Sequence, residues 1–193
     1  MQWLFESEHP HLLWWEKILT ELDPNCRNKW IKNFFVNGYY GDNLRKRTEF
    51  NKKNGFFPPT VLLASITKNC NFHCKGCWAH EYDVRKDLSK EKWRAIFKEA
   101  RDEMGIHIFP IVGGEPFCRK EFLELAEEFN DCTFITFTNG SLITEKTVEK
   151  LVKLGNVQPM FSLGGYKENN DKIRGEGCFD MVMEKMDMLR EAG

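Results

Sequence analysis

From residue 58 onward, the chain alternates between two hydrophobic patterns. Short apolar runs rich in β-branched residues predict four strands, at 61–66, 106–112, 133–137 and 157–163. Apolar residues recurring every three or four positions predict four helices, at 89–104, 119–129, 144–154 and 179–192. Ser89 and Thr144 are suited to cap two of these helices, and Gly155 is suited to end one. Strand and helix repeated four times predict parallel strands joined by right-handed crossovers.

The first 57 residues follow a different pattern. Apolar positions between Leu12 and Leu22 have helical spacing, and Pro24 preceded by Asp23 marks the start of a second helix. Four of the six tryptophans lie in this segment. We therefore expect residues 1–57 to form a helical, aromatic-rich extension and residues 58–193 to form the main domain. The aromatic side chains are expected to pack on the main domain as a lid or cap, or alternatively to bind a partner.

The unusual residues of the main domain fall at the ends of the predicted strands. In parallel sheets with helical crossovers, functional sites lie at the carboxyl ends of the strands. Three cysteines follow the first strand, Gly113-Gly114-Glu115-Pro116 follows the second, Thr138-Asn139-Gly140 follows the third, and Ser162 ends the fourth. Their convergence predicts one site at this edge of the sheet.

The three cysteines, Cys70, Cys74 and Cys77, have the spacing C-x₃-C-x₂-C. A structural zinc site needs four protein ligands, whereas an iron–sulfur cube held by three cysteines leaves one iron open. His80 could supply a fourth zinc ligand, but zinc alone explains none of the other motifs at the strand ends. The chain has seven cysteines, an odd number, with three in one loop, which favours metal ligation in a reducing compartment over disulfides.

The cysteine motif, the Gly-Gly-Glu-Pro turn and the stretch 173–180 resemble the radical S-adenosylmethionine (SAM) enzymes. The resemblance covers roughly residues 60–193. It implies an α/β fold, a partial (βα) barrel of the TIM-barrel type with about four βα units, preceded by the helical extension. It also implies that Cys70, Cys74 and Cys77 hold a [4Fe-4S] cluster whose open iron binds SAM. Reductive cleavage of SAM then gives a 5′-deoxyadenosyl radical that abstracts hydrogen from a substrate.

The resemblance also indicates which residues bind SAM. The Gly-Gly-Glu-Pro turn would accept hydrogen bonds from the amino group of SAM, because glycines allow close approach of the backbone. A serine of the fourth strand would contact the ribose or carboxylate, and an arginine would pair with the carboxylate. Asn-Gly is also an ordinary turn sequence. Thr138 and Asn139, at the end of the third strand, could therefore bind SAM or simply belong to a turn. The candidates are Gly113, Gly114, Glu115, Pro116, Thr138, Asn139, Ser162 and Arg174.

Two positions depart from the pattern of the family. Members often carry an aromatic residue just before the third cysteine, where this chain has Gly76, and here Trp78 follows Cys77 instead. The residue that packs on adenine is therefore open. Members with a similar fourth strand often read Ser-x-Asp-Gly, whereas this chain has Ser162-Leu163-Gly164-Gly165. This departure leaves the serine in place and removes an expected polar neighbour.

The composition of the chain limits the classes of binding partner that are expected. The formal net charge is −1, so no overall field attracts nucleic acid and none is expected as a partner, and the basic stretch 45–47 is expected to be a solvated face. The chain has no apolar stretch that could span a bilayer and no signal peptide at its start, which predicts a cytoplasmic protein without a membrane partner.

The resemblance is greatest to the branch that includes peptide- and protein-modifying maturases. It implies an oxidoreductase that takes an electron from a donor such as flavodoxin or ferredoxin and acts on a peptide or protein. The alternative is a non-catalytic binding module stabilised by zinc or a cluster. Since the fourth predicted strand would leave an open edge, we expect the chain to be the N-terminal part of a longer enzyme, or to need a partner that completes the sheet.

Overall fold

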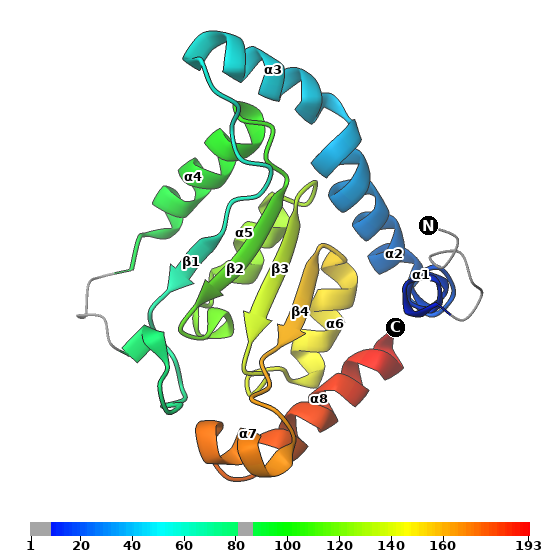
Figure 1. The fold of residues 1–193 in the computed structure, drawn as a ribbon, viewed down its shortest axis with the longest axis vertical. Helices are drawn as coiled ribbons and strands as arrows, with labels where there is room; N and C mark the ends of the chain where they lie inside the picture. The colour runs from blue at the N-terminus through cyan, green and yellow to red at the C-terminus, as the bar shows by residue number, and fades with distance from the viewer. Residues whose placement is uncertain (1–8, 81–86) are drawn as a thin grey trace.

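The computed structural model describes residues 9–80 and 87–193, and its centre is a parallel sheet. The strands are β1 (Ala64–Thr67), β2 (Ile108–Gly113), β3 (Thr133–Thr138) and β4 (Val157–Phe161), in the order β1-β2-β3-β4 (Figure 1). In the register of the sheet, Phe109 lies opposite Phe134, which lies opposite Val157. Each strand pairs with the next one in sequence, as in a βα barrel, so the predicted α/β fold with a partial barrel is confirmed.

Helices α4 (Lys90–Asp102), α5 (Phe122–Glu128) and α6 (Glu145–Leu154) pack against one face of the sheet. The caps are those expected from the sequence: the hydroxyl of Ser89 accepts a hydrogen bond from the Lys92 amide, and Gly155 ends α6 with φ = +67°. Phe97 of α4 lies over Phe109 of β2 with ring centroids 4.8 Å apart, and both side chains are fully buried. Aromatic packing between these helices and the sheet therefore forms the core.

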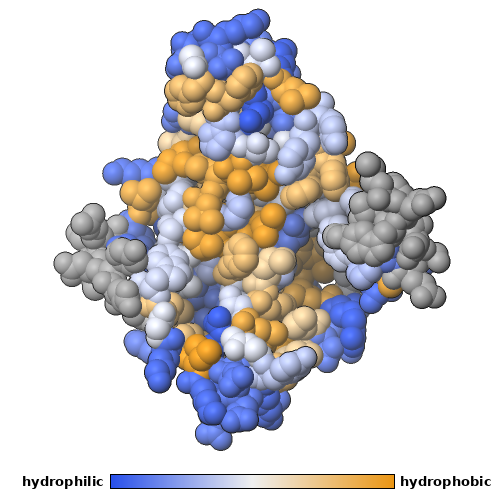
Figure 2. Space-filling view, in the orientation of Figure 1, coloured by the Kyte–Doolittle hydropathy of each residue, from blue (hydrophilic) through white to orange (hydrophobic). Residues whose placement is uncertain are grey.

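The opposite face of the sheet is apolar and partly open. Along β3, Phe134 is buried toward the helices, whereas the exposed fraction of Phe137 is 42%. Met160 of β4 is 48% exposed. Figure 2 shows apolar surface over the middle of this face. Parallel sheets normally have both faces covered by other elements. In the described chain, by contrast, this face is an accessible apolar surface.

The chain forms one more helix after β4 than the sequence predicts. Helix α7 (Lys167–Arg174) precedes α8 (Cys178–Ala192), whereas only a helix at 179–192 was expected. Seven of the eight residues of α7, Lys-Glu-Asn-Asn-Asp-Lys-Ile-Arg, are polar, so no apolar stripe marks it. Local hydrogen bonds to the start of α8 hold it instead: the carboxylate of Asp171 accepts from the amides of Gly177 (3.0 Å) and Phe179 (2.9 Å).

Two short 3₁₀ helices frame the carboxyl ends of the strands. They are η3 (Trp78–His80) after the cysteine motif and η4 (Pro116–Cys118) after β2. Because η4 and a turn occupy the positions before it, the helix expected at 119–129 begins only at Phe122.

The N-terminal extension is a run of helices. It comprises α1 (Pro10–Thr20), α2 (Pro24–Trp30), the π-helix η2 (Ile31–Tyr40) and α3 (Asp42–Asn54). The carboxylate of Asp23 caps α2, as its position before a proline predicts. The aromatic side chains pack largely on one another; the Trp30 ring lies 5.5 Å from Trp15 and 4.9 Å from Phe35. None of the helices among the described residues is long and apolar enough to cross a membrane.

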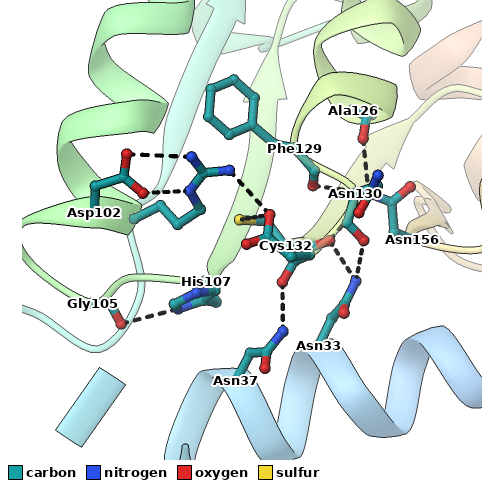
Figure 3. A network of polar contacts seen from close by, with 12 residues as sticks. Asn33, Asn37, Asp102, Gly105, His107, Ala126, Phe129, Asn130, Cys132 and Asn156 are labelled. Carbon is teal, nitrogen blue, oxygen red and sulfur yellow. Dashed lines mark hydrogen bonds and ion pairs between the residues drawn. The ribbon is translucent and has the colours of Figure 1, made fainter. Parts of the chain in front are cut away.

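This extension caps the amino ends of the strands. In Figure 3, Asn33 and Asn37 of η2 point at the turn between α5 and β3. Asn33 Nδ2 donates to the carbonyls of Asn130 (2.9 Å) and Cys132 (3.0 Å), and Asn37 Nδ2 donates to that of Asp131 (3.0 Å). The extension thus lies at the end of the sheet opposite to the candidate site, and asparagines, with Asn33 fully buried, make these contacts rather than aromatic side chains.

The basic stretch 45–47 lies on α3, and only part of it is a solvated face. Arg45 is exposed and pairs with Asp42 (2.8 Å) and Glu49 (2.7 Å). The guanidinium of Arg47 donates to the carbonyl of Pro59 (2.6 Å), which ties the extension to the segment that enters β1.

We predict that Asn33→Ala lowers the free energy of unfolding by about 1–3 kcal/mol, because the substitution removes two hydrogen bonds between η2 and the turn before β3. Urea denaturation measures this change. Asn28→Ala, at an exposed position of α2, is the matched control and should leave the stability within about 0.5 kcal/mol of wild type. Equal stabilities of the two variants would contradict the anchoring role of Asn33.

Candidate functional site at the carboxyl ends of the strands

The loop after β1 carries Cys70, Cys74 and Cys77. All three are free thiols of intermediate exposure. The loop is held at its far side, where the amide of Lys75 donates to the carbonyl of Ile173 in α7 (2.8 Å), and it turns back where the Cys77 amide donates to the Cys74 carbonyl (3.2 Å). Helix α7, which the sequence did not predict, therefore positions the cysteine loop.

The sulfur of Cys70 accepts two N–H groups. The donors are the amide of Phe72 (3.4 Å) and the side-chain amide of Asn139 (3.9 Å). Burial raises the pKa of the Cys70 thiol, and the nearby Glu115 carboxylate raises it further. A metal-bound sulfur is a thiolate, so metal binding at Cys70 would release a proton.

The two glycines after β2 pack against the beginning of the cysteine loop. The amide of Gly114 donates to the carbonyl of Thr67 (2.8 Å). A Cβ atom would lie 2.2 Å from the Thr67 oxygen if placed on Gly113, and 2.2 Å from the Asn69 oxygen if placed on Gly114. From the sequence, these glycines were expected to let a ligand approach the backbone closely. In the structure, they let the backbone at the start of the cysteine loop approach closely.

The carboxylate of Glu115 joins the ends of β2 and β3. It is 0% exposed and accepts hydrogen bonds from the Thr138 hydroxyl (2.8 Å), the Asn139 amide (2.7 Å) and the Phe117 amide (3.1 Å). Burial raises its pKa, while the three donors act in the opposite direction. Pro116, also buried, begins η4 immediately afterwards. Thr138 and Asn139 are thus brought to the site as partners of Glu115.

Sequence reasoning missed two residues beside the cysteines. The side chains of Asn71 and Ser141 hydrogen-bond to each other (2.7 Å) and both contact Asn139. Asn71 lies within the cysteine motif, so its position could have suggested a role, whereas Ser141 carries no signal in the sequence.

Ser162 and Arg174 complete the edge of the site. The amide of Ser162 donates to the Thr138 carbonyl (2.9 Å), which places Ser162 directly beside the end of β3. Arg174 is the last residue of α7, next to the carbonyl that holds the cysteine loop. Its Nε atom is buried and has no hydrogen-bond partner. A buried guanidinium nitrogen without an acceptor fits an anionic ligand such as a carboxylate.

The three thiols of the cysteine loop can be compared with the ligands that a four-iron cluster needs. Within the described residues, no three His, Cys, Asp or Glu side chains are arranged to hold one metal ion. The side chain of His80, the fourth ligand of the zinc alternative, lies outside the described part of the chain. In a cube, each thiolate binds a different iron, so the three sulfurs need not converge on one point. Three free thiols with N–H donors to one of them suit such a cluster.

The fold and the site define a βα-barrel domain with a three-cysteine loop at the carboxyl ends of its strands. The family model described as the radical SAM superfamily matches residues 64–193. The chain therefore belongs to the radical SAM superfamily, a family of enzymes.

Several relatives share this part of the chain. It is 32% identical over 138 residues to Fe-coproporphyrin III synthase of Methanosarcina barkeri, covering 69% of this chain and 34% of the relative. It is 33% identical over 146 residues to mycofactocin maturase MftC of Mycolicibacterium smegmatis, covering 73% and 37%. The crystal structure of Streptococcus suis SuiB bound to SAM matches with a TM-score of 0.64 and 27% identity, covering 79% and 36%. The chain thus spans about a third of the length of these relatives.

The raised pKa of Glu115 predicts a specific dependence of stability on pH. The folded state keeps the proton at pH values where the unfolded chain, with the ordinary pKa of 4.5, has lost it. The contribution of Glu115 to stability therefore falls as the pH rises from about 4.5 through the folded pKa. We expect wild type to gain stability relative to Glu115→Gln as the pH is lowered from neutral toward 4.5. Urea denaturation at several pH values measures this, and a constant difference between the two proteins would contradict it.

Proposed function

We propose that this chain is the cluster- and SAM-binding part of a radical SAM enzyme, with a [4Fe-4S] cluster on Cys70, Cys74 and Cys77. The observation that carries the proposal is the position of three free thiols at the carboxyl ends of the parallel strands, facing the end of α7. When bound, such a cluster supplies the electron that cleaves SAM to a 5′-deoxyadenosyl radical, which abstracts hydrogen from the substrate.

The residues of the chain bind and orient SAM. Arg174 pairs with its carboxylate, because the unpartnered Nε is available for an anion. Backbone carbonyls of the Gly-Gly-Glu-Pro turn accept from its amino group, and Ser162 contacts its ribose or carboxylate. Glu115 contributes by holding the turn, since its carboxylate oxygens already accept from Thr138, Asn139 and Phe117. The contacts of Arg174, Ser162 and the turn with SAM are those expected from the sequence. Glu115 and Thr138 contribute indirectly, by holding the turn in place.

The substrate proposed is a peptide or protein. PqqA peptide cyclase of Rhizobium meliloti is 29% identical over 132 residues, and SuiB has been crystallised with its precursor peptide SuiA. The open apolar face of the sheet, with Phe137 and Met160, offers a surface for such a chain beside the cysteine loop. The likeness to Fe-coproporphyrin III synthase makes a tetrapyrrole the second candidate. The enzyme is proposed to receive its electron from a donor such as flavodoxin or ferredoxin.

Electron paramagnetic resonance on anaerobically reconstituted, reduced protein tests the proposal directly. A four-iron signal that changes when SAM is added supports both the open iron and the SAM site. A cluster signal that ignores SAM, or zinc in place of iron, would favour the non-catalytic binding module.

We predict that Cys74→Ala abolishes assembly of the four-iron cluster, because two thiolates cannot hold the cube in place of three. Iron and sulfide content after anaerobic reconstitution measures the loss. Cys26→Ala, in the extension, is the matched control and should bind iron as wild type does. A full cluster in the Cys74 variant would rule out this ligand set.

We predict that Arg174→Gln weakens SAM binding roughly tenfold or more, since a charge-assisted hydrogen bond contributes about 1.5–3 kcal/mol. Equilibrium dialysis under anaerobic conditions measures the Kd, and iron content should stay at the wild-type level. Arg190→Gln, at the surface of α8, is the control. Unchanged affinity in the Arg174 variant would remove this residue from the SAM site.

A further inference from the structure

A closed ring of three side chains connects the cysteine loop to the end of β3. Asn139 Nδ2 donates to Asn71 Oδ1 (3.0 Å), Asn71 Nδ2 donates to the Ser141 hydroxyl (2.7 Å), and that hydroxyl donates to Asn139 Oδ1 (2.6 Å). Asn71 is separated from the other two by 68 and 70 residues. The ring therefore fixes the first cysteine turn relative to the sheet.

The amide of Asn139 uses all of its hydrogen-bonding capacity within the protein. A side-chain amide has two N–H donors and an oxygen that can accept twice. Nδ2 donates to Asn71 and to the Cys70 sulfur (3.9 Å), and Oδ1 accepts from the amide (2.9 Å) and the hydroxyl of Ser141. No donor or acceptor of this side chain is left for SAM, although the sequence assigned Asn139 to SAM binding.

Asn139 is also rigidly placed. Asn139 is only 7% exposed, and its backbone amide donates to the buried Glu115 carboxylate (2.7 Å). The direction of its Nδ2–H toward Cys70 is thus set by the sheet and does not depend on a mobile surface rotamer. A donor fixed in this way keeps its N–H directed at the Cys70 sulfur.

We propose that Asn139 is a positioning residue for the iron–sulfur cluster rather than a SAM ligand. It holds the Cys70 turn through Asn71 and donates an N–H to the Cys70 thiolate. This inference rests on the proposed function. Hydrogen bonds to cluster sulfurs stabilise the more negative, reduced state, so this N–H raises the reduction potential.

Three variants test the proposal. Asn139→Ala removes the ring and the donor to Cys70, whereas Asn71→Ala, at an exposed position, removes the ring but leaves that donor. Asn169→Ala, on the exposed surface of α7, is the matched control. Each protein is reconstituted anaerobically, and its midpoint potential, its cluster loss to a ferrous chelator and its SAM affinity are measured. Thermal unfolding by circular dichroism checks the fold.

We expect Asn139→Ala to shift the midpoint potential to more negative values and to lose its cluster roughly tenfold faster, with unchanged affinity for SAM. Asn71→Ala should lose its cluster faster with a smaller shift in potential.

Two results would overturn the inference while the proposed function stands. One is a wild-type potential and cluster lifetime in Asn139→Ala; the other is weakened SAM binding in this variant with an unaltered cluster. A wild-type protein that takes up no cluster would overturn the proposed function, and the role of Asn139 toward a cluster would fall with it.

Discussion

The site depends on one buried carboxylate, that of Glu115. Its backbone amide bonds to Asn69 at the start of the cysteine loop, and its side chain accepts from Thr138 and Asn139 at the end of β3. One residue of β2's terminal turn thereby links three segments that meet at the carboxyl ends of the strands. Burying a carboxylate is costly unless donors surround it, and here three donors do so. Together with α7 and the hydrogen bonds of Asn71, this arrangement positions the cysteine loop.

The two ends of the sheet are built differently. At the amino ends, Asn33 and Asn37 donate to the carbonyls of a turn, and the extension closes that end with polar contacts. At the carboxyl ends, polar groups surround free thiols, and the Nε of Arg174 is left without an acceptor. Satisfied groups stabilise the fold, whereas a guanidinium nitrogen without an acceptor is a candidate to bind a ligand. The separation lets the extension stabilise the barrel without covering the site.

The strands and the helices that pack on them could be predicted because their buried apolar residues recur with the period of a strand or a helix. Phe97, Phe109 and Phe134 meet in the core and lie on elements whose apolar spacing is clear. Helices α3 and α7 escaped prediction because nearly all of their residues are polar. The hydrogen bonds that hold them, from Arg47 of α3 to Pro59 and from Lys75 to Ile173 of α7, leave no periodic pattern.

The sequence by itself determined the family, the parallel order of the strands and the loop that carries Cys70, because spacing, turn residues and alternation are local properties. Only the tertiary structure decided what the polar residues of the site contact. Asn71 reaches Asn139 across 68 residues, and the Glu115 carboxylate points into the protein toward β3. Hydrogen bonds between such distant segments depend on how the strands pack, and no local pattern records that packing.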